Sequence, residues 1–223
     1  AFRHAHLTNQ ADILLNEIER LVSQTPWRYS DPINRVIVGR LFLLRGGDPR
    51  QVLELAYDRA QRDNPDIIDA AIATAELALE KQDFALALGS LEKAVEVDAD
   101  NPLVYFLLSQ ALAPTDPARA AAALEKALEL NPQHLPTRIF LAERLIDQEQ
   151  YDPAREQLMQ VLQVNPRHSQ AWAYMAVIAH LENDLSGEQA WHTIASQWPE
   201  EDADVDYWIG LKLSQKYRFT EGS

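Results

Sequence analysis

The sequence LEKALELNP occupies residues 124–132, and a closely similar stretch, LMQVLQVNP, occupies residues 158–166. Both end in Asn-Pro, and Asn-Pro also occurs at Asn64-Pro65 and Asn101-Pro102, so that successive prolines lie 37, 30 and 34 residues apart. A proline disfavours helical geometry in the residue before it and cannot continue the helical hydrogen bonds. We therefore interpret each Asn-Pro as the end of a helix in a repeated unit.

Small and apolar residues precede each Asn-Pro with helical spacing. They lie 12, 8 and 5 residues before each proline, once three extra residues are allowed before Pro102. A spacing of i, i+4 and i+7 places them on one face of a helix. The triplets are Leu53, Tyr57 and Ala60; Ala87, Leu91 and Ala94; Ala120, Leu124 and Ala127; and Ala154, Leu158 and Val161.

A second helical pattern follows each Asn-Pro, and a short polar turn separates the two helices of each unit. In three of these turns an Asp-Pro pair predicts a helix start, with Asp48, Asp116 or Asp152 as the cap and the proline as the first helical residue. The turns are RGGDP (45–49), KQDF (81–84), PTDP (114–117), EQYDP (149–153) and NDLSG (183–187).

These features resemble the tetratricopeptide repeat family, whose unit is a helix-turn-helix of 34 residues. The unit at 133–166 has the family length without gaps, although Arg138 stands where the family often has tryptophan. Its matching positions are Leu141, Ala142, Tyr151, Ala154, Leu158, Val161 and the closing Pro166. The resemblance covers about residues 30–223, and it implies an all-α, right-handed superhelical solenoid.

The expected organisation is an N-terminal helix or cap in residues 1–29, five helix pairs and a partial unit. The pairs are expected at 30–65, 66–102, 103–132, 133–166 and 167–199. Residues 200–223 are predicted to be an acidic linker and a half repeat, with Asp206 capping its helix and KYRF (216–219) forming the next turn. Because the chain stops where a partner helix should start, we expect it to be a truncated piece of a longer protein.

The composition limits the kind of partner. The net charge is −14, and residues 1–65 hold nine arginines and eight carboxylates while the remainder holds eleven basic and 26 acidic residues. Such acidity repels nucleic acid and favours basic or apolar partners, unless it serves only to keep the protein in solution. No apolar run is long enough for membrane insertion. The absence of cysteine excludes disulfides and thiolate metal sites, and it leaves the compartment unknown.

The sequence contains none of the common catalytic or phosphate-binding motifs, so we expect no catalytic residue, no metal and no cofactor. His134 and His168 lie 34 residues apart, each two residues after an Asn-Pro proline. We interpret them as polar residues in equivalent turns rather than as a metal pair. The acidic stretch PEEDADVD (199–206) lacks the spacing of a calcium loop.

In the tetratricopeptide repeat family the first helix of each unit lines a concave face that binds peptides or partner helices. The resemblance implies a partner-binding face at Ile72, Glu76, Leu79, Phe106, Ser109, Ile139, Glu143, Ile146, Ala173, Val177 and His180. These apolar and acidic residues favour a protein or peptide with apolar anchors and basic residues. Family members that bind acidic chaperone tails use Lys, Arg and Asn at this face, so such a tail is not expected here.

Two functions remain open from the sequence. The first is a non-catalytic protein–protein interaction scaffold that binds a peptide or partner protein on the concave face. The alternative is the repeat or docking portion of a larger enzyme, whose catalytic domain lies outside this chain. YWIGLKLSQKYRFTEG (207–222) resembles bacterial multi-repeat arrays that precede a metallopeptidase-like domain, which favours the alternative.

Overall fold

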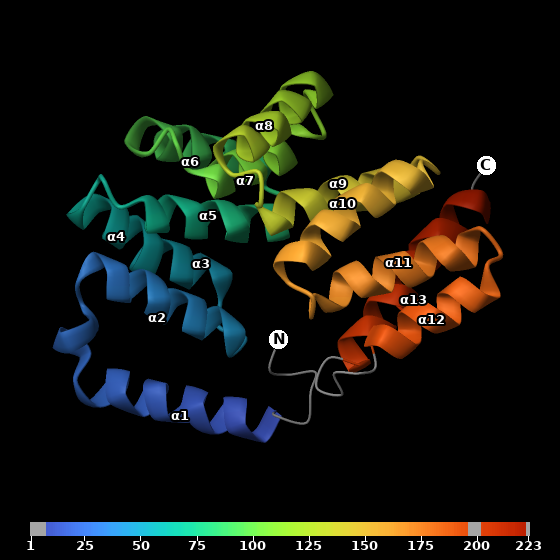
Figure 1. Ribbon diagram of the computed structural model, residues 1–223. Helices are drawn as coiled ribbons and strands as arrows, with labels where there is room; N and C mark the ends of the chain where they lie inside the picture. The colour runs from blue at the N-terminus through green and yellow to red at the C-terminus, as the bar shows by residue number, and fades with distance from the viewer. Residues whose placement is uncertain (1–7, 196–201, 222–223) are drawn as a thin grey trace. The chain divides into compact units, whose positions relative to one another are not determined.

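The structure is a computed structural model, and it describes residues 8–195 and 202–221 (Figure 1). The described residues form helices joined by short turns, which confirms the predicted all-α fold. The helices are α1 (Thr8–Gln24), η1 (Pro26–Tyr29), α2 (Pro32–Leu44), α3 (Pro49–Val52), η2 (Leu53–Tyr57), α4 (Asp58–Asp63), α5 (Ile68–Glu80), α6 (Phe84–Val97), α7 (Pro102–Leu112), α8 (Pro117–Leu130), α9 (Leu135–Asp147), α10 (Tyr151–Val164), α11 (Ser169–Leu181), α12 (Leu185–Ala195) and α13 (Asp202–Glu221).

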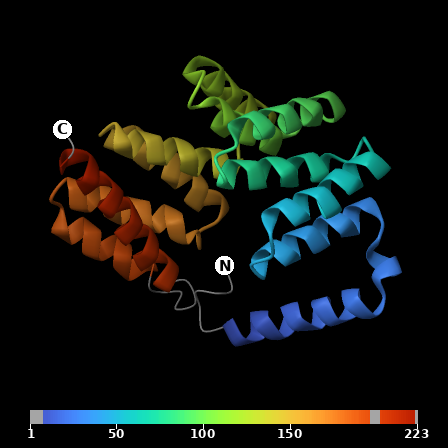
Figure 2. The same ribbon diagram turned by 180° about the vertical axis from the view of Figure 1, so that it is seen from behind.

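The helices pack as antiparallel pairs within two compact units, one spanning Asp12–Pro132 and one that contains the chain from Gln133 onward. In the first unit α2 pairs with the continuous helix α3–η2–α4, α5 with α6, and α7 with α8. In the second unit α9 pairs with α10 and α11 with α12. Figure 2 shows the two helices of each pair side by side from the opposite direction.

The repeat is more regular than the Asn-Pro pairs predict. In the first four pairs the second helix ends at Asn64, Asp98, Asn131 or Asn165, at intervals of 34, 33 and 34 residues. Each of these C-cap residues has an extended backbone, with φ between −143° and −129°. The next helix begins four residues later in every case, at Ile68, Pro102, Leu135 and Ser169.

Asn101-Pro102 starts a helix, so its interpretation as a helix end was wrong. Asn101 is the N-cap of α7 and accepts a hydrogen bond from the Leu103 amide, while Pro102 takes the first helical position. The residue that ends α6 is Asp98, whose Oδ1 accepts a hydrogen bond from the Asp100 amide as Asn165 Oδ1 does from Arg167. Aspartate and asparagine both form this turn, which removes the apparent insertion before Pro102.

The Asp-Pro prediction holds for two of the three turns. Asp48 and Asp116 cap α3 and α8, and each accepts a backbone hydrogen bond there. Asp152 instead lies in the first turn of α10, which begins at Tyr151 with Gln150 as its N-cap. The preceding residue, Glu149, has φ 61° and already completes the turn, so α10 starts two residues earlier than predicted.

The C-terminal segment also differs from the prediction. The helix α13 already includes Asp206 and runs through Lys216–Phe219 without a turn, so neither the Asp206 cap nor the KYRF turn is present. The expected N-terminal helix begins at Thr8 in the described residues. Residues 1–7, 196–201 and 222–223, including part of the predicted acidic linker, lie outside the described residues.

The predicted face triplets form the centre of the helix pairs. All of their members are buried except Leu53, which is half-buried. Leu53 is the first residue of the π-helical segment η2. A π-helical turn holds one more residue than an α-helical turn, so the residues before it are shifted by one position on the helix face. Val52 therefore takes the buried place predicted for Leu53, beside Tyr57 in the same cluster.

Candidate functional site

The structure places the predicted concave-face residues in three environments. Ile72, Ser109, Ile139, Ile146, Ala173 and Val177 are buried between helices. Leu79, Phe106, Glu143 and His180 are half-buried, and Glu76 is exposed. The buried members hold the helices together, so a partner can reach only the other five without a rearrangement.

In the unit Asp12–Pro132, the accessible members of this set lie on α5 and α7. Glu76 accepts a hydrogen bond of 2.9 Å from the guanidinium of Arg40 on α2, and both side chains are more than 40% exposed. Leu79 and Phe106 pack at the edge of the apolar cluster that contains Ile72. Burial raises the pKa of Tyr57 to about 12, with Arg40 lowering it and Glu76 raising it. This face therefore presents a carboxylate–guanidinium pair near apolar side chains.

In the unit that begins at Gln133, α13 packs against the corresponding first helices, α9 and α11. Val205 is buried against Ala173 and Ala195. Ile209 and Leu213 pack against the buried cluster formed by α9, α10 and α11. The helix α13 thus covers part of the face at which the sequence predicts partner binding.

Lys212 is the polar centre of this contact. Its side chain is 2% exposed, and its Nζ lies 2.7 Å from Asp147 Oδ1 and 3.3 Å from Glu143 Oε1. A buried ammonium group is costly unless it is paired in this way. The two carboxylates of α9 therefore fix the position of α13.

Lys216 lies one turn further along α13 and binds the end of α9. Its Nζ is 3.1 Å from Glu149 Oε1 and donates to the carbonyl oxygens of Asp147 at 3.2 Å and Ile146 at 3.5 Å. The last carbonyl groups of a helix lack partners within the helix and attract cations. Lys216 thus satisfies the C-terminus of α9.

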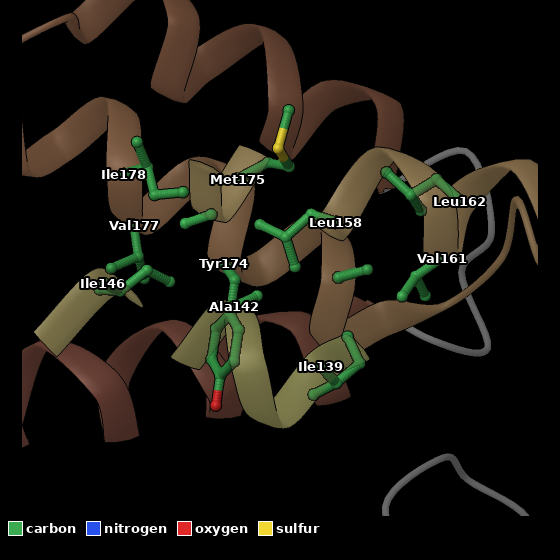
Figure 3. Close-up of a cluster of buried hydrophobic side chains, with 12 residues drawn as sticks. Ile139, Ala142, Ile146, Leu158, Val161, Leu162, Tyr174, Met175, Val177 and Ile178 are labelled. Carbon is green, nitrogen blue, oxygen red and sulfur yellow. The ribbon is translucent and has the colours of Figure 1, made fainter. Parts of the chain in front are cut away.

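Tyr174 extends the polar contact into α11. Burial first, and then the nearby Glu143 carboxylate, raise the pKa of the Tyr174 hydroxyl above its usual value. Gln170 Nε2 donates to the same hydroxyl oxygen at 3.0 Å. Figure 3 shows the Tyr174 hydroxyl directed away from the aliphatic side chains of the cluster.

The sequence analysis identified Glu143 but missed Asp147, Tyr174, Lys212 and Lys216. A signal was present, because Lys212 follows Val205 by seven residues and Ile209 by three. This spacing puts the lysine on the apolar face of its helix. It was overlooked because residues 200–223 were assigned to a half repeat.

His134 and His168 occupy the same N-cap position, before α9 and α11. His168 Nδ1 accepts from the Ala171 amide at 3.4 Å, and His134 Nδ1 lies 2.7 Å from Thr137 Oγ1. Burial lowers the pKa of both imidazoles.

Among the residues that the structure describes, no group of three or more His, Cys, Asp or Glu side chains could hold a metal ion. No helix within 8–195 or 202–221 combines the length and apolar character needed to cross a bilayer.

Comparisons with known proteins agree with this architecture. Residues 111–178 match the family model of the tetratricopeptide repeat. No curated protein sequence matches the chain.

Several solved structures share the fold at low sequence identity. A thermophilic tetratricopeptide repeat protein of Thermus thermophilus superposes with a TM-score of 0.65 at 21% identity, covering 82% of this chain and 98% of that one. PilW, a type IV pilus biogenesis factor, gives 0.63 at 18% identity, covering 84% and 90%. PilF of Pseudomonas aeruginosa gives 0.62 at 18% identity, covering 86% and 97%. The match at residues 111–178 and these structural likenesses show that the chain is similar to tetratricopeptide repeat proteins in sequence over that stretch and in fold.

Proposed function

We propose that this protein is a non-catalytic scaffold that binds a peptide or protein segment carrying apolar and basic residues. Each of the two units offers its own binding surface on the accessible sides of its first helices, at Glu76, Leu79 and Phe106 in one unit and at Glu143 in the other. One observation carries the proposal: carboxylates on α5 and α9 already bind basic side chains supplied by other helices of the chain. The surface therefore has the chemistry of a receptor for lysine or arginine.

The pair formed by Glu76 and Arg40 suits exchange with a partner. An ion pair between exposed side chains contributes only about 0–1 kcal/mol, so an incoming cation can replace Arg40 at little cost. Leu79 and Phe106 provide apolar contact on the same unit. A partner with a basic residue beside apolar anchors satisfies both features.

The fold supports the same conclusion by analogy. Arrays of paired helices have extended surfaces suited to holding other proteins. PilW, which has a similar fold, is described as a pilus biogenesis factor. A fold alone does not specify a partner, so the chemistry of the surface carries the argument.

Selection of a random peptide library on the immobilised full chain tests this proposal. We expect the enriched peptides to combine large apolar residues with lysine or arginine. Glu76→Lys should weaken their binding about three- to tenfold, because it replaces a favourable charge contact with repulsion. Isothermal titration calorimetry with individual synthetic peptides measures the change.

Glu129→Lys is the matched control for Glu76→Lys. Glu129 lies on α8, a second helix of a pair, and it also forms one exposed ion pair, with Lys126. Binding should be unchanged in this variant. Enrichment of acidic peptides, or equal weakening by both substitutions, would contradict the proposal.

A further inference from the structure

The packing of α13 differs from that of the first helix of a repeat. Within each unit, such a helix packs on the second helix of the preceding pair, as α7 packs on α6 and α11 on α10. By contrast, α13 packs mainly on α11, touches α12 little, and reaches back to α9 through Lys212 and Lys216. It therefore lies across the first-helix surface, in the place of a bound ligand.

The face that α13 presents has a simple pattern. Its packed residues are Val205, Trp208, Ile209, Lys212, Leu213 and Lys216. In the sequence VDYWIGLKLSQK (205–216) they recur every three or four residues, as on one side of a helix. Apolar residues fill the first part of this side, and the two lysines, one turn apart, lie in the second part. This is the mode in which an amphipathic helix binds a groove.

The distribution of charge allows the contact to open. The Lys212 side chain is 2% exposed, but its partners Glu143 and Asp147 are 31% and 47% exposed. When α13 leaves, the ammonium group returns to water with its helix, and the carboxylates that stay behind are already accessible to water. Separation therefore leaves no unpaired charge buried in the repeats.

We propose that the α9–α11 surface is a binding site for an amphipathic helix with apolar residues followed by two lysines one turn apart. In the free protein α13 fills this site as an intramolecular ligand, and a helix of the same pattern from another protein displaces it. The proposal rests on the proposed function and specifies the class of partner. Because α13 belongs to the same chain, it competes at an effective concentration on the order of millimolar. A partner must therefore bind tightly or be held nearby.

A labelled synthetic peptide of residues 202–221 tests the exchange when titrated into the full chain and followed by fluorescence anisotropy. The full chain with Lys212→Glu and Lys216→Glu should release its own α13, because these changes place carboxylates against Glu143, Asp147 and Glu149. We expect the peptide to bind this variant at least tenfold more tightly than the wild-type chain. A peptide that carries the same two substitutions should not bind.

Charge reversal on α9 provides the matched rescue. The full chain with Glu143→Lys and Asp147→Lys should reject the wild-type peptide and bind the peptide with Lys212→Glu. Lys81→Glu, which changes a lysine in an exposed pair with Glu80, should bind the peptide as the wild type does. Circular dichroism must show that each variant keeps its repeats folded. Lys216→Glu alone is a milder release variant, since Lys216 retains some exposure.

Equal binding of the peptide to wild type and released variant would overturn the proposal. Loss of helical structure in both the double and the Lys216→Glu variants would also overturn it, since a displaceable helix must leave the repeats intact. If the library peptides still bind Glu76→Lys more weakly than Glu129→Lys, either result overturns this inference but leaves the proposed function in place. If two copies of the chain form a dimer in which each binds the α13 of the other, the partner is a second copy of the chain rather than another protein.

Discussion

The helices at the two ends of the described chain, α1 and α13, contact their neighbours in opposite ways. On α13, Val205 is 1% exposed and Lys212 is 2% exposed. On α1, the apolar side chains Ile13 and Leu14 remain 60% and 63% exposed. Polar contacts between α1 and the end of α2 converge on Arg45, which meets Asn16 and Glu19. Buried contacts therefore fix α13, whereas polar contacts at the surface hold α1.

The difference shows that amphipathic sequence alone does not decide how firmly a terminal helix packs. Several apolar side chains of α1 remain exposed. By contrast, α13 carries two lysines on its packed face, and each of them pairs with a carboxylate. A buried charge that has only one set of partners selects one position of the helix, while apolar residues tolerate several. The buried ion pair therefore specifies where α13 binds.

The largest effect should come from Lys212→Glu. The new carboxylate is repelled by Glu143 and Asp147 and releases α13, so the unit that begins at Gln133 should lose the stabilisation that α13 provides, and its free energy of unfolding should fall by about 3–5 kcal/mol. Urea denaturation followed by tryptophan fluorescence measures this change. Arg45→Glu, at the α1 contact, should cost about 1 kcal/mol or less, since its partners are exposed. Equal effects of the two substitutions would remove the distinction between the end helices.

A smaller effect is expected from Gly39→Ala, which tests close packing at the N-terminal end. A Cβ at Gly39 would lie 2.6 Å from Tyr57 Cε1 and 2.9 Å from Ala56 Cβ, so we expect a destabilisation of about 1–3 kcal/mol. Thermal unfolding monitored by circular dichroism measures it. Gly89→Ala is the control: apart from its chain neighbours and the local helix backbone, no heavy atom lies within 4 Å of its Cβ position, and the change should stabilise α6 by about 0.5–1 kcal/mol. A stabilising Gly39→Ala would show that α2 does not approach Tyr57.

Comparison of Leu213→Ala with Leu14→Ala tests the apolar contacts of the two end helices. Leu213 packs against the buried cluster, and its truncation should cost about 1–2 kcal/mol. Leu14 is 63% exposed, so its truncation should change stability by less than about 0.5 kcal/mol. Chemical denaturation of both variants provides the measurement. A larger loss for Leu14→Ala would mean that α1 buries this side chain in solution.

The smallest effect concerns pH. Burial lowers the pKa of His168 below its unfolded value, so its contribution is present above the unfolded pKa and is lost as the pH falls through the lowered folded pKa. Protonation also prevents Nδ1 from accepting the Ala171 amide. His168→Asn keeps a cap acceptor that does not titrate, and it should reduce the loss of stability on acidification by about 0.5–1 kcal/mol. An equal loss of unfolding free energy between neutral and mildly acidic pH in the wild type and in His168→Asn would contradict this assignment.

The sequence was sufficient to predict the helix pairs because the apolar spacing and the turn residues agree. It misplaced the end of α6, since Asp98 forms the same turn as Asn131 without a following proline, and it also placed the start of α10 two residues too late. It also predicted Leu53 where Val52 is buried, because a π-helical residue insertion leaves no mark in an i, i+4 pattern. Local chemistry therefore determines most of the fold, but exact registers depend on packing.

The candidate site was less predictable. Helical spacing identified Glu143, yet several residues of the predicted face, such as Ala173, are buried beneath neighbours. The contact between α9 and α13 joins residues 69 positions apart, and no single-helix pattern reveals such a pair.

Hydrogen exchange of the α13 amides in the full chain is the most direct test of the central claim. We predict that the amides of residues 205–216 are protected in the free protein. An excess of isotopically labelled peptide 202–221 should accelerate their exchange while the α9 and α11 amides stay protected. Unchanged exchange at saturating peptide, or simultaneous loss of protection in α11 and α13, would show that α13 is a fixed part of the repeats and would contradict the account.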